Sequence, residues 1–485
     1  MNNQLRKLFV VVLLMFCALG LAVTHNHVLR APQLNADSRN ARSILHAAET
    51  DRGPIIVDGI AVASSSKIED TRRYQRTYSE GPLYAPVTGY FSSTFSQSTG
   101  IEAAASQVLS GDSSALLIQR IRNLFTGNTR QGGGVALTLD PQLQRIAAEK
   151  LGSRKGAVVA LDAQTGAIRA LYSSPSYDPN TLAVQDGAAA EAAYEALVTD
   201  PSRPLYNRAI AGDLYRPGSS FKVLTTIALL QKGVAQPDTH MDSPTEATLP
   251  TTRTSIENYG HSACGNGNPT LAEAFARSCN TTFVLASASL THDDLAGLTQ
   301  KFGFGDSLEI PLKVTPSIFP EKTDPAQLAL TTIGQFDVKV TPLQMAQIAQ
   351  AIANNGEMMK PYLINEILDA DLQTQSKTSP TSLGAPISAE VAHALTRMMR
   401  DVVEAPYGTA RSLLGLPFPI AVKTGTAENG DEHKRTTASV MGFAPADNPQ
   451  IAFAIFVEGD DADPQPTGES AAGPILRALL EAGIK

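Results

Sequence analysis

A serine and a lysine three residues apart stand at a break in the chain. Ser219 and Lys222 directly follow Pro217-Gly218 and open an apolar run. Positions i and i+3 share one helix face, so the Ser219 hydroxyl and the Lys222 amine can touch. The Pro-Gly break places Ser219 at a helix N-terminus, where unpaired backbone N–H groups can bind a developing oxyanion. Burial favours the neutral amine that a general base requires, so the pattern is typical of an activated serine nucleophile.

The spacing of these two residues is a weak signal by itself. It recurs at Ser64 and Lys67, and a serine at a helix N-terminus is often a plain helix cap. Two further motifs strengthen the signal: Ser278-Cys279-Asn280 follows, and Lys423-Thr424-Gly425 comes later on a predicted strand. Another S-x-N, at residues 38–40, precedes both candidate serines. The serine–lysine pair, S-x-N and K-T-G in this order form the signature of serine enzymes that interact with penicillin.

The elements that must position these motifs follow from periodicity and turn composition. Strands are predicted at residues 135–139, 156–162, 167–172, 420–424, 438–444 and 451–458. Residues 156–172 form a hairpin around AQTG, and Asp140 caps a helix that runs to about Leu151. Residues 219–360 have a mainly helical pattern, and residues 474–482 form a closing helix. Strands at both ends with helices between them predict an α+β fold, in which helices flank an antiparallel sheet.

The N-terminus carries a membrane signal. Arg6 and Lys7 precede residues 8–23, an apolar run without a charge, and Thr24 can complete a crossing. A cleaved signal peptide is the alternative, but the small residues near the end of the run form poor cleavage sites. In both cases the chain beyond the run is exported, because the basic pair stays inside.

The sequence resembles the class B penicillin-binding proteins, the peptidoglycan D,D-transpeptidases, and among them the actinobacterial members. Beyond the three motifs the resemblance includes RNAR (39–42), DRGPI (51–55), YAPVTGYFSS (84–93), LTLDPQLQ (137–144), PSYDPN (175–180), YRPGSSFK (215–222), GQ-x5-TPLQMA (334–346) and KTGTAE (423–428). The centre of the family's S-x-N motif is variable, so Cys279 is permitted. One departure is Phe336, where the family leads us to expect glycine after Gly334-Gln335.

The resemblance implies four parts of the chain. Residues 1–7 would be a cytoplasmic tail, and residues 8–24 an uncleaved signal-anchor that crosses the cell membrane once. Residues 25–134 would be a smaller non-catalytic pedestal domain of the dimerisation type, ending in the linker TGNTRQGGG. Residues 135–485 would be an extracytoplasmic transpeptidase domain with the penicillin-binding fold.

The resemblance also implies a role for each catalytic residue. Ser219 would attack the penultimate D-Ala carbonyl of a stem peptide and release the last D-Ala, with Lys222 as the base. Ser278 would relay the proton towards the leaving amine together with Lys423. Asn280 would hydrogen-bond the substrate backbone.

The predicted strand that carries K-T-G would supply the substrate-binding residues Thr424, Gly425 and Thr426. Lys423 and the two threonines would hold the terminal carboxylate of the donor. The N–H groups of Ser219 and Thr426 would form the oxyanion hole.

Composition and family together indicate the partners. A net charge of −8 without a Lys/Arg-rich tract argues against nucleic acid. The implied partners are peptidoglycan stem peptides, β-lactam antibiotics, the membrane through one N-terminal helix, and wall-synthesis proteins such as a lipid-linked glycan polymerase. The chemistry needs no cofactor or metal. A role in elongation or division, the acceptor chemistry, the oligomeric state and the effect of Phe336 stay open.

Other activities remain alternatives. A serine β-lactamase would require an E-x-x-L-N stretch to activate a deacylating water, and the sequence has none. A D,D-carboxypeptidase differs only in its acceptor and stays open. A non-catalytic wall-assembly scaffold or β-lactam sensor would need no intact lysine and serine set. Turnover to a cross-linked product separates these possibilities.

The three cysteines are divided between two environments. Cys17 lies in the membrane run, whereas Cys264 and Cys279 lie in the exported part, where thiols tend to oxidise. These two have no other intramolecular partner, so we predict a disulfide between them. Two unpaired thiols are the alternative, because sequence cannot establish the Cα separation of about 4.4–6.8 Å that a bridge needs.

Overall fold

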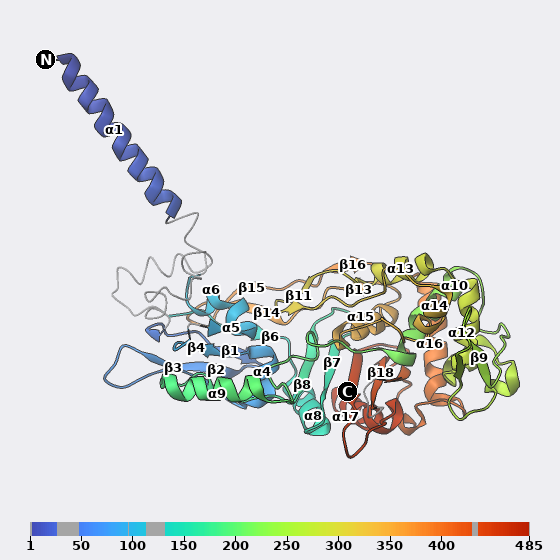
Figure 1. The fold of residues 1–485 in the computed structure, drawn as a ribbon. Coiled ribbons are helices and arrows are strands. Elements are labelled where there is room, and N and C mark those ends of the chain that lie inside the picture. The colour runs from blue at the N-terminus through green and yellow to red at the C-terminus, as the bar shows by residue number, and fades with distance from the viewer. Residues whose placement is uncertain (1, 27–47, 96, 113–130, 429–434, 485) are drawn as a thin grey trace.

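The fold is described from a computed structural model that covers residues 2–26, 48–95, 97–112, 131–428 and 435–484. A five-stranded antiparallel sheet and a six-stranded mixed sheet organise these residues (Figure 1). The RNAR stretch and most of the predicted linker, residues 126–130, lie outside the described residues.

The five-stranded sheet joins segments from both ends of the catalytic half. Its order is β17-β18-β19-β7-β8, and every neighbouring pair is antiparallel. Its strands are β7 (Gly156–Asp162), β8 (Ile168–Ser174), β17 (Ala421–Glu428), β18 (Thr436–Ala444) and β19 (Ile451–Glu458). The predicted hairpin and the three predicted C-terminal strands are therefore confirmed. Every residue of β18 is buried, because helices cover both faces of the sheet.

The covering helices come from widely separated segments. α15 (Pro342–Ala353) is buried along its whole length and contacts β7, β18 and β19. α8 (Pro141–Leu151) and α17 (Gly473–Gly483) pack against each other on the opposite face (Figure 1). The predicted cap of α8 is confirmed, because the Asp140 carboxylate accepts hydrogen bonds from the N–H groups of Gln142 and Leu143.

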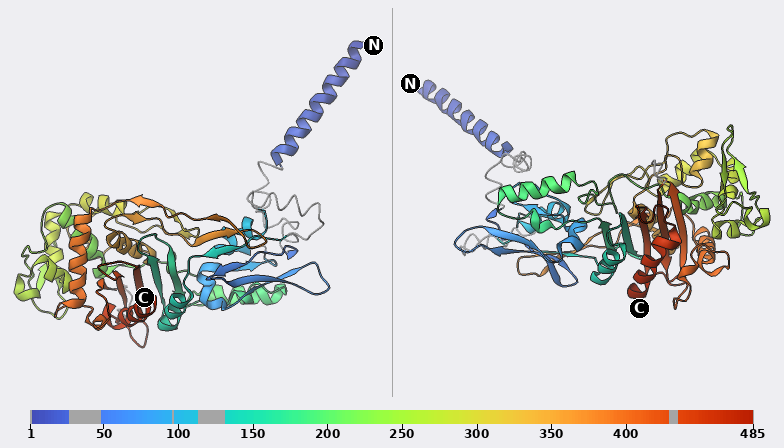
Figure 2. Two further views of the ribbon diagram at one scale, coloured as in Figure 1. Left: turned by 180° about the vertical axis from the view of Figure 1, so that it is seen from behind. Right: turned by 60° about the horizontal axis from the view of Figure 1, so that its bottom comes forward.

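The mainly helical part lies beside β17, the edge strand of the five-stranded sheet. α16 (Ala389–Glu404) contacts β17 and also α10 and α11, so it links the sheet to the helices. The helices are α10 (Lys222–Gln231), α11 (Leu271–Ala276), α12 (Asn280–Ala286), α13 (His292–Lys301) and α14 (Pro325–Thr331). Figure 2 places this part at the end of the molecule remote from α1.

Short strand pairs interrupt the predicted helical pattern. They are β9 (Glu246–Thr248) with β10 (Ser255–Glu257), β11 (Leu308–Glu309) with β12 (Lys313–Val314), and β13 (Met358–Met359) with β16 (Ser382–Gly384). These strands of two or three residues are too short for period-2 alternation to emerge from the sequence.

The six-stranded sheet straddles the domain boundary predicted at residue 134. Its order is β15-β14-β6-β1-β2-β3. Its strands are β1 (Ile55–Val57), β2 (Ile60–Lys67), β3 (Tyr74–Tyr78), β6 (Val135–Leu137), β14 (Ile364–Leu368) and β15 (Thr374–Lys377). β6 was predicted as the first strand of the catalytic domain, but it pairs with β1 and β14. The hairpin β14–β15 also reaches this sheet from the catalytic half, so the two halves share a sheet.

Short helices pack around the six-stranded sheet. They are α4 (Gly81–Thr88), α5 (Gly100–Ala104), α6 (Ser106–Leu109) and α9 (Gly187–Thr199), with a strand pair β4 (Phe91–Ser92) and β5 (Gln97–Ser98). α6, the last described helix before residue 113, ends at Leu109, and residues 113–130 lie outside the described part.

A buried ionic cluster holds the N-terminal half together. The fully buried Glu102 carboxylate accepts from Arg52 Nε at 2.5 Å and from Arg76 Nε at 2.6 Å. The Tyr78 hydroxyl donates to the same carboxylate at 3.2 Å. Burial alone would raise the pKa of Glu102, but Arg76 and Arg52 outweigh it and lower the pKa. The carboxylate therefore stays ionised and ties β3 and α5 to the segment before β1.

The N-terminal helix stands apart from both sheets. α1 (Asn2–Thr24) contains the predicted membrane run, and its segment Gln4–Thr24 is long and apolar enough to cross a membrane. No part of that apolar window is buried against the rest of the protein (Figure 1). A signal sequence would have the same properties, so the uncleaved anchor stays a prediction.

Candidate active site

Ser219 lies where a short helix touches the edge strand. The 3-10 helix η4 (Gly218–Phe221) leads directly into α10. Gly218 has φ of +53°, and a Cβ there would lie 2.4 Å from the Thr426 carbonyl oxygen of β17. Upstream, the Tyr215 ring stacks on Phe456 of β19 at 5.0 Å between centroids. The glycine and the aromatic anchor together bring the predicted nucleophile against the K-T-G strand.

The Lys222 amine is surrounded by the other predicted catalytic residues. Its Nζ lies 3.1 Å from Ser219 Oγ, 2.7 Å from the Ser278 carbonyl oxygen and 2.8 Å from Asn280 Oδ1. A neutral amine has two N–H donors and one lone pair. The Ser278 carbonyl and the Asn280 amide oxygen can only accept, so they take the two donors. The lone pair then faces the Ser219 hydroxyl, which is the arrangement of a base and its nucleophile.

The electrostatic environment favours that neutral amine. Lys222 is fully buried, and burial followed by the nearby Lys423 lowers the pKa of its amine well below 10.5. Among the described residues, no carboxylate forms a salt bridge with either lysine. The ring of Phe283 lies 5.4 Å from Lys222 Nζ and replaces water on one side.

Ser278 adopts an unusual backbone conformation at the end of α11. Its φ is +60°, the left-handed region that costs a non-glycine residue roughly 1–2 kcal/mol. Glycine is the usual residue at such a helix end, but only a side chain can present a hydroxyl to both lysines. Ser278 Oγ lies 2.9 Å from Lys423 Nζ and 3.3 Å from Lys222 Nζ.

A disulfide fixes the residue after Ser278. Cys279 is bonded to Cys264, with 6.0 Å between the Cα atoms. This is the pairing that the sequence predicts. It ties the strained Ser278 and the start of α12 to the loop that follows β10.

The K-T-G residues come from the edge strand β17. Lys423 is fully buried, and burial lowers the pKa of its amine to about 7. Gly425 has no room for a side chain, because a Cβ there would lie 2.3 Å from Ser439 Oγ and 2.5 Å from Ser220 Oγ. Thr426 is exposed, whereas Thr424 is 7% exposed and its hydroxyl oxygen lies 2.6 Å from Thr409 Oγ1.

The structure therefore brings all three motifs to one place. Residues 156–481 match the family described as the penicillin-binding protein transpeptidase domain, and residues 52–135 match the penicillin-binding protein A dimerisation domain. The chain belongs to the penicillin-binding protein transpeptidase family. In this transpeptidase, the sheet meets the helices at the K-T-G strand, at η4 and at the S-x-N turn.

Relatives span the whole chain. It is 41% identical to the peptidoglycan D,D-transpeptidase PbpA of Mycolicibacterium smegmatis, over 100% of this chain and 99% of the relative. It is 38% identical to PbpA of Mycobacterium tuberculosis over the same shares. Penicillin-binding protein A from M. tuberculosis, solved as a penicillin G acyl-enzyme complex, gives a TM-score of 0.84 at 37% identity, covering 90% of this chain and 100% of that chain.

Two other serine candidates in the transpeptidase have the wrong surroundings. Ser64 and Lys67 lie on β2, where residues three apart point to opposite faces of the strand. Ser220 is fully buried and its hydroxyl pairs with Ser439 Oγ at 2.9 Å. Geometry therefore favours Ser219 over both.

Several site contacts had no signal in the sequence. Asn280 Nδ2 donates to the Glu257 carbonyl oxygen at 2.9 Å, so both amide atoms of Asn280 bond within the protein. Ser439 contacts Ser220 from a segment 219 residues away, and Thr409 contacts Thr424 from 15 residues upstream. Phe336 has φ of +62°, which explains why glycine is favoured there, and its carbonyl accepts from Arg216 Nε at 3.3 Å.

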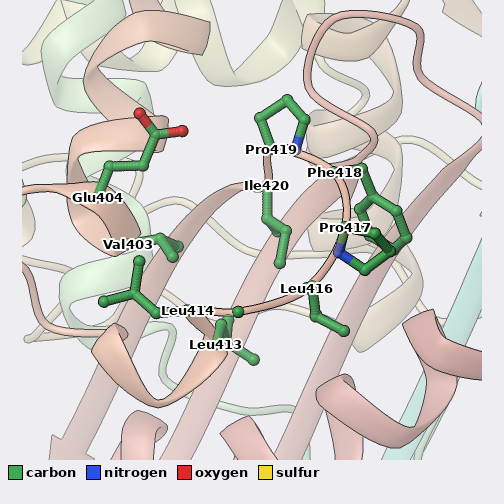
Figure 3. A pocket seen from close by; sticks show the side chains of 10 residues that line it. Val403, Glu404, Leu413, Leu414, Leu416, Pro417, Phe418, Pro419 and Ile420 are labelled. Carbon is green, nitrogen blue, oxygen red and sulfur yellow. The ribbon is translucent and has the colours of Figure 1, made fainter.

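Two pockets of the described structure lie away from the motifs. Figure 3 shows a pocket of about 270 Å³ between the end of α16 and the entrance to β17, lined by Val403, Glu404 and residues 413–420. A cavity of about 780 Å³ lies between α4 and α5 and residues 204–213. No group of three His, Cys, Asp or Glu side chains that could hold a metal ion occurs within the described ranges.

Proposed function

We propose that the chain is a peptidoglycan D,D-transpeptidase that works through an acyl-enzyme on Ser219. The observation that carries the proposal is the buried Lys222 amine, whose nitrogen lies 3.1 Å from Ser219 Oγ and 2.7 and 2.8 Å from two oxygens that can only accept. The names of the full-length relatives support the same reaction and substrate.

In the first half-reaction Ser219 Oγ attacks the penultimate D-Ala carbonyl carbon of a donor stem peptide, and Lys222 takes the hydroxyl proton. Backbone N–H groups of Ser219 and Thr426 hold the resulting oxyanion, in a site where fixed donors act strongly. The C–N bond then breaks and D-Ala leaves.

The leaving amine needs a proton, and Ser278 is positioned to supply it. Its hydroxyl contacts both Lys423 and Lys222, so the proton that Lys222 accepted can return through Ser278 to the leaving nitrogen. Asn280 holds Lys222 in this network. Lys423, Thr424 and Thr426 bind the terminal carboxylate of the donor.

In the second half-reaction the amine of a neighbouring stem peptide attacks the ester carbon. An amide cross-link forms, the Ser219–carbonyl bond breaks, and the serine recovers a proton from the attacking nitrogen through Lys222. A β-lactam enters by the first half-reaction, and its ring amide opens onto Ser219. M. tuberculosis penicillin-binding protein A is known as such an acyl-enzyme with ceftriaxone, imipenem and penicillin G.

We further propose that α1 anchors the enzyme in the cell membrane with the catalytic part outside the cytoplasm. The long apolar helix near the N-terminus and the basic pair Arg6 and Lys7 support this orientation. In this arrangement residues 25–134 act as a pedestal, and a glycan polymerase of the same membrane is the expected partner.

Turnover with a defined acceptor tests the function. The protein is incubated with a stem peptide ending in D-Ala-D-Ala and an isotope-labelled amine acceptor, and the products are identified by mass spectrometry. A labelled cross-linked amide that disappears in Ser219→Ala and persists in Ser64→Ala supports the proposal. Release of D-Ala without cross-linking would indicate a D,D-carboxypeptidase, and no turnover by the wild-type protein would indicate a scaffold or sensor.

A further inference from the structure

A short turn after α16 contacts Thr424 of the K-T-G motif and Arg277, the residue before the S-x-N motif. Residues 405–410 fold back onto the helix end, where the N–H of Gly408 donates to the Ala405 carbonyl and that of Ala410 donates to the Val402 carbonyl. Gly408 admits no side chain, because a Cβ there would lie 2.3 Å from the Val402 oxygen. The turn is thus fixed to a helix that itself contacts β17 and α11.

Two side chains of this turn reach towards the motifs, one on the helix side and one on the strand side. On the helix side, the Tyr407 ring centroid lies 4.3 Å from the guanidinium carbon of Arg277, the residue before Ser278. Arg277 also forms a salt bridge with Glu273 at 2.8 Å. On the strand side, Thr409 Oγ1 lies 2.6 Å from Thr424 Oγ1. The turn therefore bridges the residue before Ser278 and the K-T-G strand.

The contact between the two threonines has a directional consequence. Each hydroxyl carries a single proton, so only one of them can donate in this hydrogen bond. In the described part of the chain, neither hydroxyl has another hydrogen-bond partner. If Thr409 donates, the Thr424 proton is free to point at a ligand, and the two bonds strengthen each other in series. If Thr424 donates, its proton points at Thr409 and is not available to a ligand.

We propose that Thr409 is a positioning residue that donates to Thr424 Oγ1 and thereby aims the Thr424 O–H at the carboxylate of the donor or of a β-lactam. The inference rests on the proposed function, because it assigns Thr424 to that carboxylate. Thr409 itself contacts no substrate. The Thr409 hydroxyl should therefore speed acylation only by ligands that carry this carboxylate. A purely structural role would affect ligands with and without the carboxylate alike.

The test compares Thr409→Val, which removes the hydroxyl at constant shape, with Thr409→Ser, which keeps it. Thr396→Val is the matched control, because the Thr396 hydroxyl is also half-buried and bonds only within α16, to the Ala392 carbonyl at 2.9 Å. The second-order rate constant of acylation is measured with benzylpenicillin and with its methyl ester, which lacks the carboxylate charge.

We expect Thr409→Val to slow acylation by benzylpenicillin about tenfold, in line with a lost hydrogen bond to a charged group. Acylation by the methyl ester should change less than about twofold, and Thr409→Ser and Thr396→Val should behave as the wild type. In a Thr424→Val background, Thr409→Val should have no further effect, because the bond is already absent.

Three outcomes would overturn the proposal. Equal slowing with the acid and the ester would indicate a structural role, and faster acylation of Thr409→Val by benzylpenicillin would indicate that Thr424 is the donor. Additive effects of Thr409→Val and Thr424→Val on the acylation rate would show that the two hydroxyls act independently. Failure of the wild-type protein to form an ester at Ser219 would instead contradict the proposed function, so the two failures are distinguishable.

Discussion

The two halves of the molecule each bury charged side chains, but they do so in opposite ways. In the N-terminal half the Glu102 carboxylate is matched by Arg52 and Arg76, and its pKa is lowered despite full burial. In the catalytic half Lys222 and Lys423 are equally buried, no salt bridge to either occurs in the described residues, and both pKa values are lowered towards the neutral amine.

The difference separates a structural cluster from a reactive one. A buried charge that is paired with opposite charges stays ionised and holds the neighbouring segments in place. Buried amines without a carboxylate partner lose their proton more easily and become available for proton transfer. Site residues of this kind work against stability, which natural enzymes tolerate in exchange for activity. Each of the following experiments perturbs either the ionic cluster around Glu102 or the catalytic half around Lys222 and Lys423.

The largest effect is expected at Lys222. Lys222→Arg should slow acylation of Ser219 by benzylpenicillin by about 10³-fold or more, because a guanidinium cannot act as a base at neutral pH. Lys423→Arg should retain a measurable part of the rate, since it keeps a positive charge beside the carboxylate. The rates are followed by the appearance of the acylated mass. Equal losses in the two arginine variants would contradict their separate roles.

The structural cluster should respond in stability instead of rate. Glu102→Gln removes the carboxylate that two buried guanidinium groups share, and we expect a loss of about 3–5 kcal/mol in the free energy of unfolding. Chemical denaturation measures this loss. Glu80→Gln is the control, because Glu80 pairs with Arg145 at the surface and should matter little. An unchanged denaturation midpoint in Glu102→Gln would contradict a stabilising role for the cluster.

The sequence predicted the reactive side of this comparison better than the structural side. Ser219, Lys222, Ser278, Asn280 and Lys423 have spacings and neighbours that encode their chemistry locally, and the structure brings them within hydrogen-bonding distance. Nothing in the sequence placed Arg52, Arg76 and Glu102 together, because pairing between distant segments leaves no periodic pattern.

The same limit applies to the fold. The hairpin β7–β8 and the cap of α8 could be predicted because turn and cap residues act over a few positions. The joining of β14 and β15 to β6 and β1 in one sheet could not be predicted, because β14 pairs with a strand more than two hundred residues away in the sequence. Thr409 was missed for a different reason: its contact with Thr424, 15 residues away, joins that motif residue to a single threonine that belongs to no motif or periodic pattern. The left-handed backbone of Ser278 was missed because a serine stands at a helix end where glycine is usual.

The disulfide should also support acylation at Ser219, because it fixes the position of the neighbouring Ser278. A bridge across 15 residues stabilises the folded state by roughly 3 kcal/mol in the chain-entropy model. Cys264→Ser should therefore lower the unfolding midpoint and slow acylation at Ser219. Alkylation of the unreduced, denatured protein from the exported compartment checks the bond: both cysteines should be protected until reductant is added. Modification of both without reductant would refute it.

The most gradual effect, about 1 kcal/mol for each pH unit, concerns the pH dependence of stability. Lys423 has a pKa of about 7 in the folded protein, against about 10.4 in an unfolded chain. Between these values the unfolded state binds more protons, so the free energy of unfolding should rise with pH, by about 1 kcal/mol per pH unit. Lys423→Met should flatten the rise in denaturation curves taken from pH 7 to 10. An identical rise in the variant would assign the effect to other groups.

The central claim is that Ser219 is the nucleophile that Lys222 activates, and mapping the penicillin ester tests it most directly. The protein is incubated with benzylpenicillin, digested, and analysed by mass spectrometry for the peptide that carries the added mass. The label should map to Ser219, disappear in Ser219→Ala, and persist in Ser220→Ala and Ser64→Ala. Label that persists in Ser219→Ala, or that maps to Ser64, would contradict the account.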